Sequence, residues 1–365
     1  MNLAARCQQI DSSGIRKIFD LATTLKDPVN LSIGLPDFDV PNPVKEEAIL
    51  HIQMGHNRYT PSAGLPELRE KMKNHLKSRG LFVEDLLITS GVSGGLFLSL
   101  LALLNAGETA LVPDPYFVIY KELPTLLGAK IQYLDTYPDF RLTPEQLRKV
   151  ITPECKILFL NNPANPTGRI LSRETLKQIA EVLKGSGIWV ISDEIYDAFD
   201  FEGQHSFFGS LYEKTVTLGG FSKTSGMTGW RVGYAAGPKE LIEAMIKIQQ
   251  YTFVCAPSFA QYASLKALDL SLLELRDTYR KKRDFVMDAL KDHYEMQKPD
   301  GAFYIFMKHP KWDGNRLAQE AIKKEVLLVP GSIFSTRNTH FRLSFANTDT
   351  MLQKGVDRLR SLSHE

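Results

Sequence analysis

Residues 215–236 read TVTLGGFSKTSGMTGWRVGYAA, and this stretch is the most informative part of the sequence about the fold. A strand-like run, 215–219, leads into a loop of glycines and hydroxyl residues, and a second run follows at 232–236. Lys223 in that loop is not on a solvated helix face, and its small neighbours let a ligand approach the backbone closely. Arg231 carries a planar fork that can clamp a phosphate. The plainer interpretation is a phosphate-binding turn with an incidental lysine.

Similar runs precede this stretch, with helical patterns between them. The runs 109–113, 130–134, 156–160 and 188–192 are largely apolar, as strands buried on both faces must be. Helical spacing of apolar residues marks 66–79 and 172–184. This alternation predicts an α/β fold whose mostly parallel sheet is covered by helices on both sides.

The C-terminal part has a different pattern. A long charged helix is expected over 273–294, followed by strand-like runs at 302–307, 326–330 and 341–345. The 365 residues suit two domains. We therefore predict a large domain over 41–256 and a smaller α+β domain over 257–365. Residues 1–40 are expected to be an N-terminal segment that packs with the small domain.

Composition excludes several classes of protein. The formal net charge of +2 gives no field for nucleic acid or an anionic membrane surface. The most apolar run, 96–104, is too short to span a bilayer, and the first residues lack a signal peptide's apolar run. Cys7, Cys155 and Cys255 form no CxxC pair, and the histidines lack metal-ligand spacing. We expect a cytoplasmic protein without a metal site.

Asp193 directly follows the run 188–192, at a position where open α/β sheets bind ligands. The alternative for this residue is a helix N-cap. Tyr196 adds a phenol nearby, although a core tyrosine is equally ordinary.

Two further loops also follow or precede apolar runs. Residues 161–168, NNPANPTG, form a rigid turn in which a peptide bond could be cis. Residues 89–95, TSGVSGG, open an apolar helix and leave free N–H groups that suit a phosphate. The loop is neither a P-loop nor a GxGxxG fingerprint, which argues against a dehydrogenase.

Taken together, these loops resemble the fold-type I pyridoxal-phosphate enzymes, specifically the class I/II aminotransferase family, with most similarity to prokaryotic aspartate and aromatic aminotransferases. The strings SK…GWRVG and NPTG, in this order, are the most specific part. The resemblance covers nearly the whole chain and includes SGIR at 13–16, GLPDFD at 34–39, YTPSAGLPELR at 59–69, GAFY at 301–304, VPGS at 329–332 and FRLSF at 341–345.

The resemblance implies a seven-stranded large-domain sheet and a role for each matching residue. Lys223 would hold pyridoxal 5′-phosphate as a Schiff base and later move a proton from the substrate Cα. Asp193 would pair with the pyridine nitrogen. Tyr196 and Asn165 would bind the phenolic oxygen. Phe117 would stack on the ring, with Tyr116 as the alternative.

The same resemblance implies a phosphate cup and a carboxylate site. The cup would use the side chains or backbone of Arg231, Ser222, Gly91, Val92 and Ser93. Many relatives have serine where this chain has Gly220, so one contact is expected to be missing. Tyr59 would reach the neighbouring subunit's phosphate, which implies a homodimer with shared active sites. Arg342 would clamp the substrate carboxylate, and Gly34 would allow close backbone approach.

The resemblance implies an aminotransferase that moves the amine of an L-amino acid to a 2-oxo acid, with 2-oxoglutarate expected, by a ping-pong mechanism. The alternative is a cysteine-S-conjugate β-lyase, because fold does not fix reaction. Ser93 stands where some aspartate-specific relatives have lysine, and Arg16 could compensate. Ile15, Phe19 and Leu35 could instead form an apolar wall, so aspartate and aromatic donors both stay open.

Overall fold

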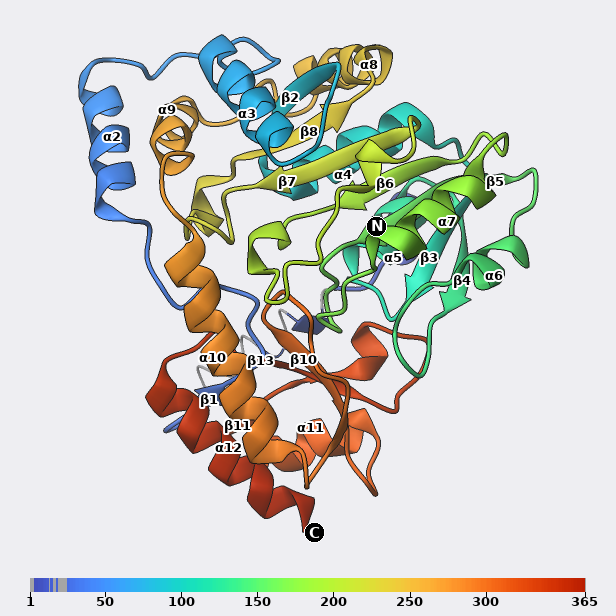
Figure 1. Ribbon diagram of the computed structural model, residues 1–365, viewed down its shortest axis with the longest axis vertical. Helices are drawn as coiled ribbons and strands as arrows, with labels where there is room; N and C mark the ends of the chain where they lie inside the picture. The colour runs from blue at the N-terminus through green and yellow to red at the C-terminus, as the bar shows by residue number, and fades with distance from the viewer. Residues whose placement is uncertain (1–2, 13, 16–17, 19–24, 365) are drawn as a thin grey trace.

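The computed structural model describes residues 3–12, 14–15, 18 and 25–364. Seven strands form the large sheet, in the order β2-β8-β7-β6-β5-β3-β4 (Figure 1). Strands from β7 to β4 run parallel, and β8 is antiparallel to both neighbours. The bounds are β2 Asp85–Thr89, β3 Thr109–Asp114, β4 Lys130–Asp135, β5 Cys155–Asn161, β6 Trp189–Asp193, β7 Thr215–Gly220 and β8 Gly233–Gly237.

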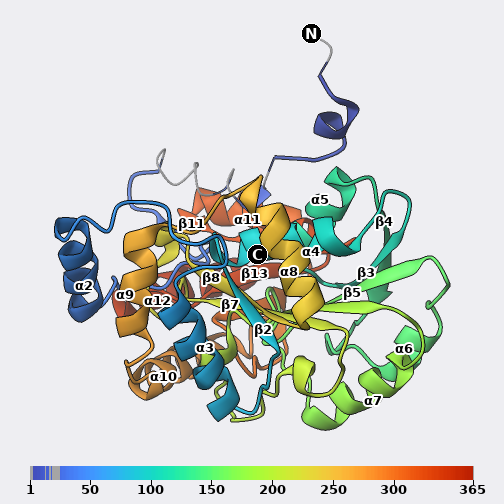
Figure 2. The same cartoon turned by 90° about the horizontal axis from the view of Figure 1, so that it is seen from above.

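Helices cover both faces of this sheet (Figure 2). Apolar side chains of α4, α5 and α8 pack against one face, and those of α3, α6 and α7 pack against the other. The helix α2 packs on α9 instead of the sheet. The bounds are α2 Asn42–Gln53, α3 Pro66–Ser78, α4 Gly91–Leu103, α5 Ile119–Leu126, α6 Pro144–Arg148, α7 Arg173–Leu183, α8 Lys239–Gln250 and α9 Ser258–Ala267.

The helix α7 shows how local sequence sets an element. The hydroxyl of Ser172 caps its N-terminus by accepting a 3.1 Å hydrogen bond from the Thr175 N–H. Four apolar side chains at helical spacing are buried on the sheet side, and they are Leu176, Ile179, Ala180 and Leu183. The predicted helix 172–184 is confirmed, because Ser172 and Lys184 are the N-cap and the C-cap of α7.

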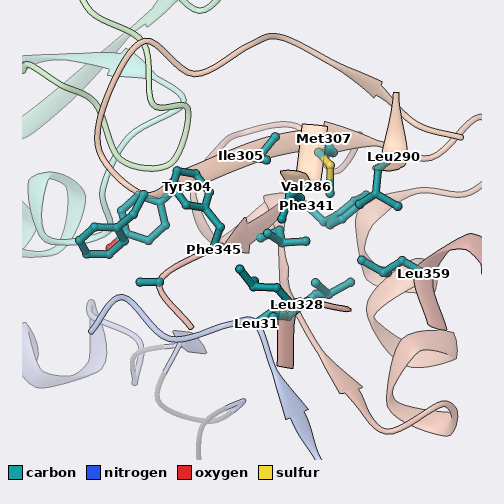
Figure 3. Close-up of a cluster of buried hydrophobic side chains, with 14 of the residues drawn as sticks. Leu31, Val286, Leu290, Tyr304, Ile305, Met307, Leu328, Phe341, Phe345 and Leu359 are labelled. Atoms are coloured by element: carbon teal, nitrogen blue, oxygen red, sulfur yellow. The ribbon is translucent and has the colours of Figure 1, made fainter. Parts of the chain in front are cut away.

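The C-terminal part forms a second, smaller sheet, in the order β12-β13-β10-β9, and a separate pair, β1-β11. Figure 3 shows its apolar core, where Val286 and Leu290 of α10 and Leu359 of α12 meet the strands. The bounds are β1 Val29–Asn30, β9 Glu295–Met296, β10 Tyr304–Lys308, β11 Val326–Leu327, β12 Val329–Pro330, β13 Phe341–Ser344, α10 Leu273–Leu290, α11 Gly314–Lys323 and α12 Asp349–Ser363.

The α/β fold with its mostly parallel sheet of seven strands is confirmed, but some elements differ from expectation. The run 326–330 is two strands, because β11 pairs with β1 while β12 pairs with β13. The expected helix 273–294 ends at Leu290. The strand β2 was not predicted, because its few residues adjoin the loop 89–95, which dominates the local pattern.

No helix within the described residues is long and apolar enough to cross a membrane. The N-terminal strand β1 pairs with β11, and the Leu31 carbonyl accepts a 2.8 Å bond from the Ser344 N–H. These contacts join the N-terminal segment to the C-terminal part. The domain boundaries at 40/41 and 256/257 stay a prediction.

Candidate active site

The carboxyl ends of β5, β6 and β7 bring the predicted loops together around one open cavity of about 720 Å³. Side chains from all four loops line it, which agrees with the ligand position expected of an open α/β sheet. The lining includes Val92, Ser93, Phe117, Asn165, Asp193, Tyr196, Ser222, Lys223 and Arg231. The structure therefore gathers most of the residues that the sequence predicted.

Lys223 lines this cavity. Its Nζ donates a 2.7 Å hydrogen bond to the Gly34 carbonyl. Burial lowers the pKa of the amine to about 8, and the positive charges of Arg342 and Arg231 act in the same direction. About a tenth of the amine is therefore uncharged at pH 7, against well under a thousandth for an ordinary lysine, and the uncharged form is the one that acts as a nucleophile or base.

Asp193 is the last residue of β6, and its side chain is buried. Its Oδ2 accepts a 2.7 Å bond from the Tyr120 hydroxyl, and its Oδ1 accepts a 3.2 Å bond from the Ile195 N–H. Burial raises the pKa of this carboxyl to about 6, against the opposing effects of these hydrogen bonds and of Lys223. A cationic ring nitrogen would suit this carboxyl, because it would supply the missing opposite charge.

Tyr120 was missed by the sequence reasoning. It lies in the first turn of α5, three residues after Phe117, so both side chains line the cavity. That spacing on a helical turn was the available signal.

The loop 161–168 is tied to the end of β6. The Asn161 side chain donates to the Asp193 carbonyl at 2.9 Å and accepts from the Asn165 N–H at 2.7 Å. Both Asn-Pro bonds in the loop are cis, as the sequence allowed. Asn165 is thereby held over the cavity, where its Oδ1 accepts a 3.0 Å bond from Arg342.

Arg342 enters from β13 and is almost completely buried. Its second terminal nitrogen donates to the Ser32 carbonyl at 2.6 Å, and its Nε has no partner among the described residues. The guanidinium packs against the rings of Tyr304 and Phe334, 4.4 and 4.6 Å from their centroids. A buried cation without a carboxylate partner is a site for an anionic ligand.

Tyr304 connects two parts of the site. Its hydroxyl lies 2.9 Å from the Tyr196 hydroxyl, while its ring faces Arg342. Sequence reasoning placed Tyr304 in the string GAFY but gave it no role. Gly34 lies so close to the Tyr304 hydroxyl that a Cβ there would collide with it, so a residue without a side chain is required.

The other end of the cavity suits a phosphate. A Cβ on Gly91 would lie 2.6 Å from the Arg231 Nη2, so glycine is what allows the guanidinium to reach the start of α4. Arg231 donates to the Thr228 and Ser90 carbonyls at 3.1 and 3.4 Å. The free N–H groups of the first α4 turn add partial positive charge.

Gly220, where many relatives have serine, has no room for a side chain in this structure. A Cβ there would lie 2.9 Å from the Gly233 Cα and 3.0 Å from the Val232 carbonyl oxygen. The close pairing of β7 with β8 therefore accounts for the glycine.

The structure separates the two candidates for ring stacking. Phe117 lines the cavity, whereas Tyr116 is buried away from it and stacks on Tyr133 at 5.2 Å between centroids. Tyr59 does not join the site within one chain, because its side chain is 84% exposed. Arg16 and Phe19 lie outside the described residues, as do parts of the string at 13–16.

A second cavity opens from the first beside Lys223 and Arg342. Its walls are mostly apolar, and the remaining lining residues are Ile15, Ile33, Gly34, Leu35, Phe117, Val118, Asn165, Tyr196 and Tyr304. This space adjoins the amine and the guanidinium, so a ligand could contact both.

Pyridoxal phosphate fits the chemistry of these residues. The cavity offers a lysine amine for the aldehyde, a carboxyl for the ring nitrogen, an aromatic wall for the ring, and a guanidinium beside a helix N-terminus for the phosphate. Among the described residues, no three His, Cys, Asp or Glu side chains gather in a way that could hold a metal ion.

Comparisons with known proteins agree with this chemistry. The family model for aminotransferase class I and II matches residues 26–359. A probable aspartate aminotransferase of Methanocaldococcus jannaschii is 37% identical over 99% of both chains. Aromatic-amino-acid aminotransferase 2 of Thermococcus litoralis is 34% identical over 100% of this chain and 99% of its own. The structure of Thermus thermophilus aspartate aminotransferase with maleate has a TM-score of 0.96 at 34% identity, and the match covers 99% of this chain and 100% of that one.

Proposed function

Because the chain belongs to the class I and II aminotransferase family and is therefore a pyridoxal-phosphate-dependent aminotransferase, we propose that its amino donor is an aromatic amino acid or aspartate, with aromatic donors preferred. The acceptor is 2-oxoglutarate, and the two half reactions follow a ping-pong mechanism. The observation that carries the donor preference is the apolar wall of the second cavity.

The donor preference follows from what surrounds the substrate side chain. Ile15, Ile33, Leu35 and Val118 would contact it, and an aromatic ring gains free energy from such burial. Ser93 is neutral and lines the first cavity, so it brings no positive charge to the place where some aspartate-specific relatives have lysine. The named relatives include both aspartate and aromatic aminotransferases.

The cofactor would be held by the residues that line the first cavity. Arg231, Ser222 and the start of α4 (Gly91, Val92 and Ser93) would bind its phosphate. Asp193 would keep the ring nitrogen protonated, and Phe117 would stack on the ring. When bound, pyridoxal phosphate supplies an electron sink for the carbanion left by proton loss at the substrate Cα.

The protein residues then perform positioning and proton transfer. Arg342 would bind both oxygens of the substrate carboxylate, which fixes the Cα–H bond for removal. Asn165 and Tyr196 would bind the phenolic oxygen. The Lys223 amine, whose pKa is lowered to about 8 by burial and by two arginines, would take the proton from Cα.

A donor panel tests this proposal. The purified protein with pyridoxal phosphate and 2-oxoglutarate is given phenylalanine, tyrosine, tryptophan and aspartate, and glutamate formation is measured. We expect higher kcat/KM for the aromatic donors than for aspartate. The reverse order would contradict the proposed preference. Steady release of pyruvate and ammonia from a cysteine conjugate without any 2-oxo acid would instead favour the β-lyase.

We further propose a cytoplasmic homodimer with shared active sites. The side chain of Tyr59 is exposed, so it is free to reach a partner's phosphate. Large apolar side chains on and just after α2 are also exposed, and they are Ile49, Leu50, Ile52 and Met54. Such a patch on a soluble chain marks an interaction surface.

A further inference from the structure

Residues 334–337, which we call the docking segment, connect the small sheet with the large one. They follow the turn Gly331–Ile333, between β12 and β13. The Phe334 carbonyl accepts a 2.7 Å bond from the Tyr116 N–H, and the Ser335 hydroxyl accepts a 3.0 Å bond from Tyr137. Arg337 pairs with Asp135 at 2.5 Å. The segment is thus attached to the carboxyl ends of β3 and β4.

Asp114 is buried and makes a further attachment, to the exposed residue Thr336. Its Oδ2 accepts two bonds from Thr336, one from the N–H at 3.0 Å and one from the hydroxyl at 2.6 Å. Its own carbonyl accepts two bonds from Thr136, which fix the backbone at the end of β3. The other carboxyl oxygen, Oδ1, has no partner among the described residues. Among the described residues, Thr336 therefore donates both hydrogen bonds that the Asp114 carboxylate accepts.

The docking segment carries a ring that touches the carboxylate site. Phe334 is fully buried and its ring centroid lies 4.6 Å from the Arg342 guanidinium carbon. Within the described part of the chain, Arg342 makes two hydrogen bonds from its terminal nitrogens and none from its Nε, so packing must fix much of its orientation. A displacement of Phe334 would leave one side of the guanidinium unsupported.

We propose that Asp114 and Thr336 are positioning residues for the substrate carboxylate. Their hydrogen bonds hold the docking segment, the segment holds Phe334, and Phe334 holds the plane of Arg342. This inference rests on the proposed role of Arg342 as the carboxylate clamp. Asp114 also lies three residues before Phe117, so one short stretch sets the cavity wall and anchors the docking segment.

Two kinds of probe separate this role from general stability. Maleate and hydrocinnamate carry carboxylates but no amine, and calorimetry on the cofactor-loaded protein gives their dissociation constants. Hydroxylamine carries no carboxylate, and its reaction at the cofactor reports the Lys223 end of the site. We expect Thr336→Val to weaken carboxylate binding roughly three- to tenfold, less than the full value of one hydrogen bond to a charged group because Thr336 is exposed and does not touch the ligand, without changing the hydroxylamine rate. Thr336→Ser, which keeps the hydroxyl, should restore binding.

Ser332→Ala is the matched control. Ser332 lies in the same loop and bonds Asn315 at 2.8 Å, not the large sheet, so neither probe should change. Asp114→Asn is a second variant in case Thr336→Val does not fold, and a smaller fall in the same direction is expected because asparagine keeps an acceptor oxygen and loses only the charge.

Two outcomes would overturn the inference. Either Thr336→Val binds both carboxylates as tightly as the wild type, or both kinds of probe weaken together. Arg342→Lys tests the proposed carboxylate clamp separately from the positioning role of Asp114 and Thr336. If it binds carboxylates normally, the proposed clamp fails and the inference fails with it. If it loses binding while Thr336→Val does not, only the inference fails.

Discussion

At the scale of single residues, burial tunes Lys223 and Asp193 in opposite directions. The pKa of the amine falls to about 8 and that of the carboxyl rises to about 6, because burial penalises the charged form of each. The pKa values of both groups are therefore closer to 7 than they would be in water. A cofactor with an aldehyde and a cationic ring nitrogen would suit both groups, because the Lys223 amine would attack the aldehyde and the Asp193 carboxylate would pair with the nitrogen.

Asp193 gives a prediction about the cofactor-free protein. Its pKa is raised from 3.8 to about 6, so its ionisation destabilises the folded state. That cost is absent below about pH 4, where folded and unfolded chains are both protonated, and is complete above about pH 6. At about 1.4 kcal/mol per pKa unit, this cost is roughly 2–3 kcal/mol. The free energy of unfolding of Asp193→Asn, relative to the wild type, should therefore rise by that amount as the pH increases from about 4 to about 8.

Urea unfolding of both cofactor-free proteins across this pH range measures the gain. The altered hydrogen bond to Tyr120 changes the free energy of unfolding by the same amount at every pH. Only the part of the difference that varies with pH therefore reports the ionisation of Asp193. A difference in stability that does not change with pH would contradict the raised pKa.

At the scale of elements, the pairing of β7 with β8 decides what the Lys223 loop can contain. Gly220 faces Gly233 across this antiparallel pair, and the backbone fills the space of a side chain. The end of β7 is therefore held by backbone contact, and the loop hydroxyl that lines the cavity comes from Ser222.

Gly220→Ser should therefore destabilise the protein by about 1–3 kcal/mol, the usual cost of an overpacked site. Thermal unfolding measures this loss. Gly229→Ser is the control, because Gly229 is exposed and has open space around its Cβ position. If Gly220→Ser and Gly229→Ser unfold at the same temperature, the close backbone contact at Gly220 does not exclude a side chain at that position.

Much of this element structure could be predicted from sequence, because buried parallel strands are apolar throughout and ligand residues follow their ends. Asp193, Asn165 and Lys223 were found in this way. Tyr120 and Phe334 were not, because their roles depend on contacts between elements distant in sequence. The split of 326–330 into two strands was missed for the same reason, since only the partners β1 and β13 distinguish its halves.

At the scale of the whole molecule, the exposed apolar residues of α2 predict a second copy of the chain. Sedimentation should give twice the chain mass of 41.1 kDa. Leu50→Lys with Met54→Lys should weaken association, because both side chains are exposed in the single chain and would be covered in the dimer. Phe82→Lys changes an exposed apolar residue outside α2 and serves as the control. A wild-type protein that stays monomeric would refute the shared active site.

The residue that binds the cofactor can be identified directly. Borohydride reduction of the cofactor-loaded protein fixes the cofactor to its lysine, and peptide mass spectrometry then identifies that lysine. We predict that the label is on Lys223, the lysine that lies between Asp193, Arg231 and Arg342, and that Lys223→Ala carries none there. A label on any other lysine of the wild-type protein would contradict the account.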